Sequence, residues 1–268
     1  MAGTLIIIGG HEDREGEKII LREVVRRADR RRIVVVGTAS EEPEALFEQY
    51  RKAFADLGAK DVFCLDVHTR AEALSDGAAD PIKNAGAVFF TGGDQLKLTS
   101  QIGDTPVFQL SYKVYEQGGV IAGTSAGASV LSDTMLVSGE GDASPKAGDA
   151  LRMAPGFGFI HGVVVDQHFA ERGRMGRLLA AVAQNPKSVG LGIDENSAVV
   201  VERSRFRVIG EGGVYVLDGA GVTYSSVAEA DDKKPLSIHD VKIHVLAPGD
   251  RFDLNPRRPF LPAEPERS

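Results

Sequence analysis

The sequence predicts a doubly wound α/β fold, in which helices flank a mostly parallel sheet. Short runs rich in Val and Ile recur along the chain, and each ends near Gly, Thr or Asp. Continuous apolar runs of this length are typical of strands buried on both faces of a parallel sheet. Helix-like stretches separate the runs, and such alternation favours the α/β class. The predicted strands are Leu5–Ile8, Ile33–Val36, Val62–Leu65, Ala87–Phe90, Gly119–Ala122 and Val163–Val165.

Two of the intervening stretches carry clear helical signals. Glu15–Asp29 has apolar residues at helical spacing. Pro43–Leu57 opens with an acidic first turn and ends before Gly58, as a helix with a glycine C-cap does. Both stretches are long enough to cross back over a sheet between parallel strands, which supports the predicted class.

From about Ser197 the pattern changes to short apolar segments separated by charged or glycine turns, which predicts antiparallel strands appended to the sheet. The tail after Pro248 is rich in proline and charge and is predicted to be an extended strap or a frayed end. The chain has no internal repeat and no clear linker, so residues 1–268 are interpreted as one domain. The predicted appended strands are Ala198–Val201, Arg205–Ile209, Val214–Leu217 and Val241–Leu246.

Composition and charge narrow the function classes. The 268 residues are 43% hydrophobic and carry a formal net charge of -7. Phosphate binding normally needs a basic patch, so a nucleic-acid partner is not expected. The single Cys64 is interpreted as a buried strand residue, because one cysteine forms neither an intrachain disulfide nor a zinc cluster. The first apolar run is too short for a signal peptide, and no segment has the length of a bilayer span. We therefore expect a cytoplasmic protein without membrane contact.

The most informative segment surrounds Ser125. It reads G-T-S-A-G at residues 123–127, after a predicted strand and before a helix-like stretch. A tight turn of this kind exposes a serine hydroxyl rigidly, but it crowds the chain and needs small flanking residues. The turn also presents the Ala126 N–H at a helix start, where it can donate to an oxyanion. Ser125 is therefore a candidate nucleophile. The alternative is a glycine-rich helix start that packs closely or holds a phosphate.

A second glycine turn, T-G-G-D-Q at residues 91–95, follows another predicted strand. The carboxyl ends of parallel strands meet at one edge of a sheet, where ligands bind. Gly93 is therefore a candidate for the second oxyanion N–H, and Gln95 for substrate binding. The alternative is an ordinary strand-to-helix turn with Asp94 as the N-cap.

A general base must reach the serine hydroxyl, so it should lie on the same edge. Of the six histidines, His168 is best placed, because it follows the predicted strand Val163–Val165. A carboxylate should orient the imidazole, and Asp194 and Glu195 are both available. Neighbours on a strand point to opposite faces, so only one of them can meet His168, and spacing does not choose between them. The chain order serine, histidine, acid differs from that of α/β-hydrolases.

Four motifs in order resemble the cyanophycinase family. They are T-G-G-D-Q at 91–95, G-T-S-A-G-A at 123–128, D-Q-H-F at 166–169 and G-I-D-E at 192–195. Cyanophycinases are serine peptidases related to aspartyl dipeptidases, with a fold similar to that of class I glutamine amidotransferases. They degrade cyanophycin, a poly-aspartate chain with arginine on each side-chain carboxyl, and release β-aspartyl-arginine dipeptides. The resemblance implies Ser125 as nucleophile, His168 as base and Glu195 as the orienting acid.

The resemblance also implies substrate-binding roles for a set of polar residues. A helix would place Arg174 and Arg177 on one face, where two guanidinium groups can clamp carboxylates. The alternative for this pair is a solvated helix face. The polar loop His11–Asp13 lies on the same predicted edge and has no assigned role. The implied binding residues are Gln95, Asp166, Gln167, Arg174 and Arg177.

Three other functions compete with this interpretation. An α-aspartyl dipeptidase would use the same chemistry, and a flavodoxin-like binding module would explain the glycine turns but not the serine, histidine and acid. A catalytically inactive interaction protein is the third. We expect no cofactor and no metal, because one cysteine and the lack of H-E-x-x-H or H-x-H offer no metal motif. Cyanophycin is the expected partner, and the oligomeric state is left open, with a homodimer as one option.

Overall fold

The structure is a computed structural model that describes residues 2–138, 151–229 and 234–260. Its main sheet has, within these residues, nine strands in the order β17-β16-β11-β10-β1-β5-β4-β2-β3. The part from β1 to β3 is parallel, and it holds the first five strands that the sequence predicts. These are β1 (Thr4–Ile8), β5 (Val120–Thr124), β4 (Ala87–Phe90), β2 (Ile33–Val36) and β3 (Val62–Leu65).

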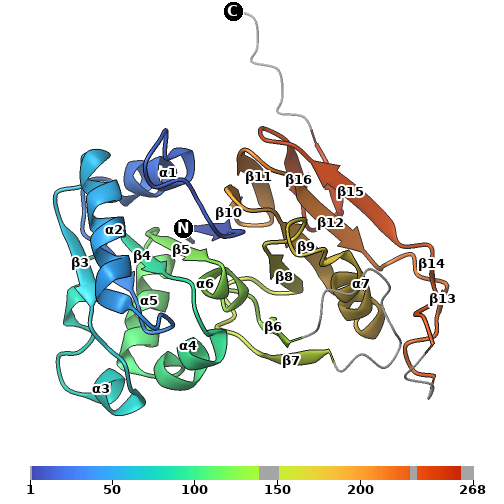
Figure 1. Ribbon diagram of the computed structural model, residues 1–268, viewed down its shortest axis with the longest axis horizontal. Coiled ribbons are helices and arrows are strands. Elements are labelled where there is room, and N and C mark those ends of the chain that lie inside the picture. The colour runs from blue at the N-terminus through green and yellow to red at the C-terminus, as the bar shows by residue number, and fades with distance from the viewer. Residues whose placement is uncertain (1, 139–150, 230–233, 261–268) are drawn as a thin grey trace, which may run out of the picture.

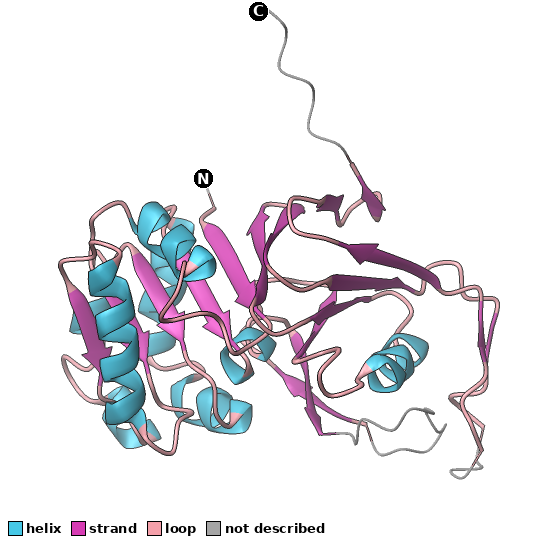
Figure 2. Cartoon of the chain, turned by 45° about the horizontal axis from the view of Figure 1, so that its top comes forward, coloured by secondary structure: helices cyan, strands magenta, loops and turns pink. Residues whose placement is uncertain are grey.

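Helices cover both faces of the parallel part (Figures 1 and 2). The side chains of β1 alternate between two cores: Ile6 packs toward α1 and α2, whereas Leu5 packs toward α3, α4 and α5. This two-sided burial explains why β1, β2, β4 and β5 read as continuous apolar runs, and it confirms the predicted fold class. The edge strand β3 is only partly buried, and its Cys64 is half-buried rather than buried as the sequence suggested. The helices are α1 (Ile19–Ala28), α2 (Pro43–Asp56), α3 (Arg70–Leu74), η1 (Asp80–Ile82), α4 (Gln95–Ile102) and α5 (Pro106–Glu116).

The other side of β1 is antiparallel, as predicted for the region after Ser197. β10 (Ser197–Glu202) pairs with β1, and β11 (Arg205–Gly210) follows it. β16 (Arg251–Asp253) and β17 (Arg258–Pro259) complete the sheet, so part of the predicted strap forms strands. The end of that predicted tail lies outside the described residues.

A second sheet holds the sixth predicted strand, which the sequence had suggested as a member of the main sheet. β8 (Val163–Gln167) runs parallel to β9 (Val189–Ile193), and α7 (Met175–Gln184) connects them. β12 (Val214–Asp218) and β15 (Lys242–Leu246) extend this sheet in the antiparallel sense. An apolar run reports that a strand is buried on both faces, but not which sheet it joins. Figure 1 shows this second sheet, with α7 packed on it, beside the helix-flanked half.

The remaining elements are short. α6 follows β5 directly, and two small hairpins lie beyond it in the chain. No helix in the described ranges combines the length and the apolar character that crossing a membrane requires. These elements are α6 (Ala126–Ser129), β6 (Thr134–Ser138), β7 (Arg152–Pro155), β13 (Tyr224–Ser225) and β14 (Ile238–His239).

Candidate active site

Ser125 occupies a strained turn between β5 and α6. Its backbone has φ 53° and ψ −115°, a conformation that an L-residue rarely adopts. The neighbouring glycines are required by contact: a Cβ on Gly123 would lie 2.1 Å from the Gly127 carbonyl oxygen. A Cβ on Gly127 would lie 2.1 Å from the Phe90 carbonyl oxygen. The small residues of the motif therefore allow the turn to close against β4 while its serine faces the cavity.

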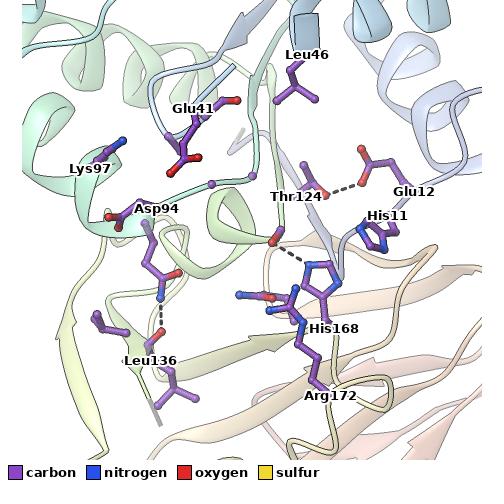
Figure 3. Close-up of a pocket in the computed structure, with 18 of the residues that line it drawn as sticks. His11, Glu12, Glu41, Leu46, Asp94, Lys97, Thr124, Leu136, His168 and Arg172 are labelled. Atoms are coloured by element: carbon purple, nitrogen blue, oxygen red, sulfur yellow. Dashed lines mark hydrogen bonds between the residues drawn. The ribbon is translucent and has the colours of Figure 1, made fainter. Parts of the chain in front are cut away.

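Ser125, His168 and Glu195 form a hydrogen-bonded row. Figure 3 shows His168 among the side chains that line the cavity. The Oγ atom of Ser125 lies 2.9 Å from Nε2 of His168. On the other side of the ring, Nδ1 lies 2.6 Å from Oε1 of Glu195. These are the contacts that a nucleophile, a general base and an orienting carboxylate need.

Asp194, the other acid that the sequence left open, points elsewhere. Its Oδ1 accepts from the Ala170 N–H at 2.9 Å, and its Oδ2 accepts from the Gly213 N–H at 3.0 Å. Burial raises the pKa of Asp194, although these two backbone bonds oppose the rise. Asp194 therefore connects two segments, the loop that contains His168 and the residue just before β12. It does not contact the imidazole, which is hydrogen-bonded to Glu195 instead.

The environment sets the charge states of the row. Burial lowers the pKa of His168 below its usual 6.5, and the hydrogen bond to Glu195 opposes this only in part. Burial by itself raises the pKa of Glu195, but hydrogen bonds to His11 and His168 outweigh it and lower the pKa overall. Near neutral pH the imidazole is therefore neutral and able to accept a proton, beside a charged carboxylate.

The two candidate oxyanion donors flank Ser125. Ala126 is the first residue of α6, so its N–H belongs to the unpaired first turn of the helix. Gly92 packs against the nucleophile, because a Cβ there would lie 3.3 Å from the Ser125 Cβ. Gly93 follows with φ 135°. The alternative interpretation of this turn is also realised, since Asp94 Oδ1 accepts from the Leu96 N–H at 2.8 Å as the N-cap of α4.

A cavity of about 790 Å³ opens over the serine. Four of the five predicted binding residues line it, namely Gln95, Gln167, Arg174 and Arg177. Gln95 also donates from Nε2 to the Leu136 carbonyl.

Asp166, the fifth predicted binding residue, does not line the cavity. It is fully buried and accepts from Nε of Arg177 at 2.9 Å and from Nη1 of Arg174 at 3.3 Å. Burial lowers the pKa of Arg174 to about 10, and the Asp166 carboxylate opposes that shift. The buried Asp166 carboxylate thus fixes the positions of both guanidinium groups. Sequence spacing correctly brought the two arginines together but did not reveal that their shared partner is buried.

Three further residues that sequence reasoning did not assign to the site, His11, Glu12 and Arg172, also line the cavity. Glu12 is almost fully buried and accepts from the Thr124 hydroxyl and from the Tyr50 hydroxyl, each at 2.5 Å. Burial, together with the Glu12 charge, raises the pKa of Tyr50 well above its usual value. The Gly-Gly turn had placed the polar loop His11–Asp13 at this edge from sequence, but no sequence signal indicated which side chains its residues contact.

One group of side chains within the described ranges is close enough to hold a metal ion. Donor atoms of His11, His168 and Glu195 lie within 4.8 Å of one another. The hydrogen bonds of the row engage both ring nitrogens of His168, so a metal would have to displace them. Metal independence therefore stays a prediction, and retention of activity in a chelator is the measurement that tests it.

Comparisons with known proteins agree with one another. The sequence profile of peptidase family S51 matches residues 5–209. The cyanophycinase of Trichormus variabilis is 37% identical over 264 residues, which cover 97% of this chain and 88% of that protein. The cyanophycinase of Synechococcus elongatus is 36% identical over 256 residues, 94% and 79% of the two chains. The cyanophycinase of Geminocystis herdmanii is 35% identical over 264 residues, 97% of each chain.

Two solved structures share the fold. A peptidase from an acI-B1 Actinobacterium has a TM-score of 0.72 at 22% identity, with 94% of this chain and 97% of that chain covered. A putative peptidase E protein from Listeria monocytogenes EGD-e has a TM-score of 0.51 at 14% identity, with 78% and 99% covered. At these identities the likeness supports the architecture alone.

Proposed function

This chain belongs to peptidase family S51, and on that premise we propose that it is a cyanophycinase, a serine-type exopeptidase that releases β-aspartyl-arginine dipeptides from cyanophycin. The observation that carries the proposal is the hydrogen-bonded row of Ser125, His168 and Glu195, in a chain that aligns with cyanophycinases over almost its whole length. A binding module of flavodoxin-like fold does not require a hydrogen-bonded serine, histidine and carboxylate.

The proposed reaction begins with attack of the Ser125 Oγ on a backbone carbonyl of the poly-aspartate chain. Nε2 of His168 takes the hydroxyl proton, and the N–H groups of Gly93 and Ala126 stabilise the oxyanion that forms. When the tetrahedral intermediate collapses, the amide bond breaks and His168 returns its proton to the departing amine. Water then attacks the acyl-enzyme by the same route, and the Ser125 hydroxyl is restored.

Charge in the cavity supports a zwitterionic substrate. Each unit of the polymer carries a guanidinium group and a free carboxylate, and Arg174 and Arg177 offer donors for the carboxylate. Because Asp166 fixes both guanidinium groups, they are held in place before the substrate binds. Preorganised donors lose less conformational entropy on binding, and buried polar groups left unpaired by a wrong substrate cost about 1–3 kcal/mol each.

Matched assays on cyanophycin, casein and α-aspartyl-arginine test the function. We expect release of β-aspartyl-arginine from cyanophycin, with at most slow cleavage of the other two. Equal or faster cleavage of α-aspartyl-arginine would favour an α-aspartyl dipeptidase of the same chemistry. No cleavage of any of the three, in a protein whose Ser125 also fails to react with a fluorophosphonate, would favour an inactive interaction protein.

We also propose a cytoplasmic location, with which the single Cys64 is consistent.

Two further parts of the proposal need their own measurements. A homodimer is tested by light scattering of the purified chain. The proposal that residues 1–268 act as one domain is tested by a single cooperative unfolding transition.

A further inference from the structure

A second imidazole contacts the carboxylate that orients His168. Nδ1 of His11 lies 2.8 Å from Oε2 of Glu195, whereas His168 uses Oε1 of the same carboxylate. The two rings meet edge to face, with centroids 5.0 Å apart and planes at 78°. Figure 3 shows His11 beside His168 at the rim of the cavity. Both carboxylate oxygens of Glu195 therefore have an imidazole partner.

The backbone of the loop after β1 sets the position of His11. The Gly9 carbonyl accepts from the His168 N–H at 2.8 Å, and the Gly10 carbonyl accepts from the Asn196 N–H at 2.8 Å. Beyond His11, the Asp13 N–H donates to Asn196 Oδ1 at 2.9 Å. The loop is thus bonded to the segments that carry both His168 and Glu195.

Local structure within the loop fixes it further. His11 itself has φ 46°, in the left-handed region that a non-glycine residue seldom adopts. The Asp13 carboxylate accepts from the N–H groups of Glu15, Gly16 and Lys18, which closes the next turn. These bonds lower the pKa of Asp13 to about 2, the bond from Lys18 most of all. A side chain on so constrained a backbone is preorganised, although 67% of its surface is exposed.

Glu195 needs such a partner for a simple geometric reason. A glutamate has one more rotatable bond than an aspartate, and 25% of this side chain is exposed. With only one oxygen held by His168, the carboxylate would be free to turn its other oxygen toward water. A donor at Oε2 restricts that rotation and keeps Oε1 in line with Nδ1 of His168.

We propose that His11 is a positioning residue of the peptidase, which acts on the reaction through Glu195. This inference rests on the proposed serine-peptidase chemistry, because it assigns His11 a part in orienting the general base. His11 does not itself exchange a proton with the substrate in this scheme. Its contribution is to hold the second carboxylate oxygen while the first stabilises the imidazolium form of His168.

Two substitutions of similar size separate positioning from packing. In His11→Asn the amide nitrogen can occupy the place of Nδ1 and still donate, whereas His11→Leu fills the space without a donor. We expect His11→Leu to lower kcat about tenfold with KM changed less than about twofold, and His11→Asn to keep most of the wild-type kcat. His68→Leu is the matched control, since His68 also contacts a carboxylate, Asp66, at 2.7 Å but lies outside the cavity.

A second measurement needs no polymer. The rate at which a fluorophosphonate phosphonylates Ser125, with loss of fluoride, reports the base directly, and it should fall with His11→Leu but not with His11→Asn. In a Glu195→Gln background the His11→Leu effect should shrink to less than about twofold, because the two residues act as one unit. Phosphonylation at the wild-type rate without cleavage of cyanophycin would count against the proposed substrate alone.

The proton NMR spectrum tests the inference without an activity assay, so it also applies to a preparation that does not turn over substrate. The low-field resonance of the proton between His168 Nδ1 and Glu195 should broaden or move upfield in His11→Leu and persist in His11→Asn. The inference is wrong if His11→Leu matches the wild type in kcat, in the rate of phosphonylation and in this resonance. It is also wrong if the loss in His11→Leu is undiminished in the Glu195→Gln background.

Discussion

The helix-flanked half of the main sheet and the smaller second sheet supply different parts of the site. The first half provides Ser125 and both candidate oxyanion donors on turns that close against neighbouring backbone. The second sheet provides His168 at the end of β8, and Glu195 just after the end of β9. Geometry within the first half is local and rigid, whereas alignment of the base with the nucleophile depends on how the two sheets meet. The loop at residues 9–13 makes that junction, because it is bonded to segments on both sides.

The largest loss of activity should come from a substitution in the helix-flanked half of the main sheet. Ser125→Ala removes the nucleophile but keeps a small residue in a turn that tolerates only small neighbours. We expect kcat to fall by about 10⁴-fold or more, with Tm little changed and binding of the polymer retained. Turnover assays with calorimetry and a sedimentation binding assay check this. Residual turnover near the wild-type rate would remove Ser125 from the mechanism.

The next effect should come from the junction between the two halves. A Cβ on Gly10 would lie 2.3 Å from Cε1 and 2.5 Å from Nε2 of His168, so Gly10→Ala must displace the imidazole. We expect kcat/KM to fall about a hundredfold, since a shift of about 1 Å in a catalytic group costs that much. Gly249→Ala is the control, because Gly249 also has a positive φ but no atom within 4 Å of an added Cβ. If both variants lose activity equally, backbone strain rather than displacement of His168 is the cause.

A smaller effect on turnover, with a larger effect on stability, should come from the second sheet. Arg177→Ala deprives the buried Asp166 carboxylate of a partner whose side chain is only 7% exposed. We expect weaker hydrolysis through a higher KM and a loss of about 3–5 kcal/mol in unfolding free energy, while the protein still folds. Urea unfolding measures the second quantity. Arg51→Ala breaks an exposed pair with Glu48 and should leave the unfolding free energy almost unchanged.

The smallest expected effect is the change of kcat/KM with pH. Burial lowers the pKa of His168, so the neutral, proton-accepting form persists to a lower pH than for an exposed histidine. We expect kcat/KM to rise with pH through a midpoint below 6.5 and to be near its plateau at neutral pH. A pH profile with a small ester substrate measures the midpoint. A midpoint above 6.5 would mean that the Glu195 charge outweighs burial at the junction.

The features that could be predicted from the sequence lie mainly in the helix-flanked half, and those that could not lie mainly in the second sheet. The elbow at Ser125 is a local structure whose signature lies within five residues, so sequence alone was sufficient to find it. The choice between Asp194 and Glu195 depends on the direction that each side chain takes, and for Asp194 that direction depends on contacts with Ala170 and Gly213 in distant segments. The pairing of β8 with β9, and the burial of Asp166, likewise depend on tertiary packing that no local pattern encodes.

The position of β1 between β5 and β10 has a consequence for protein synthesis. One neighbour of β1 is made about 115 residues later in translation, and the other, which follows Glu195 directly, almost 80 residues after that. Contacts of such long sequence separation form late, after much of the chain has left the ribosome. A nascent chain that ends before residue 195 carries the serine and the histidine without the acid. Termination before residue 195 therefore leaves the proposed catalytic centre incomplete.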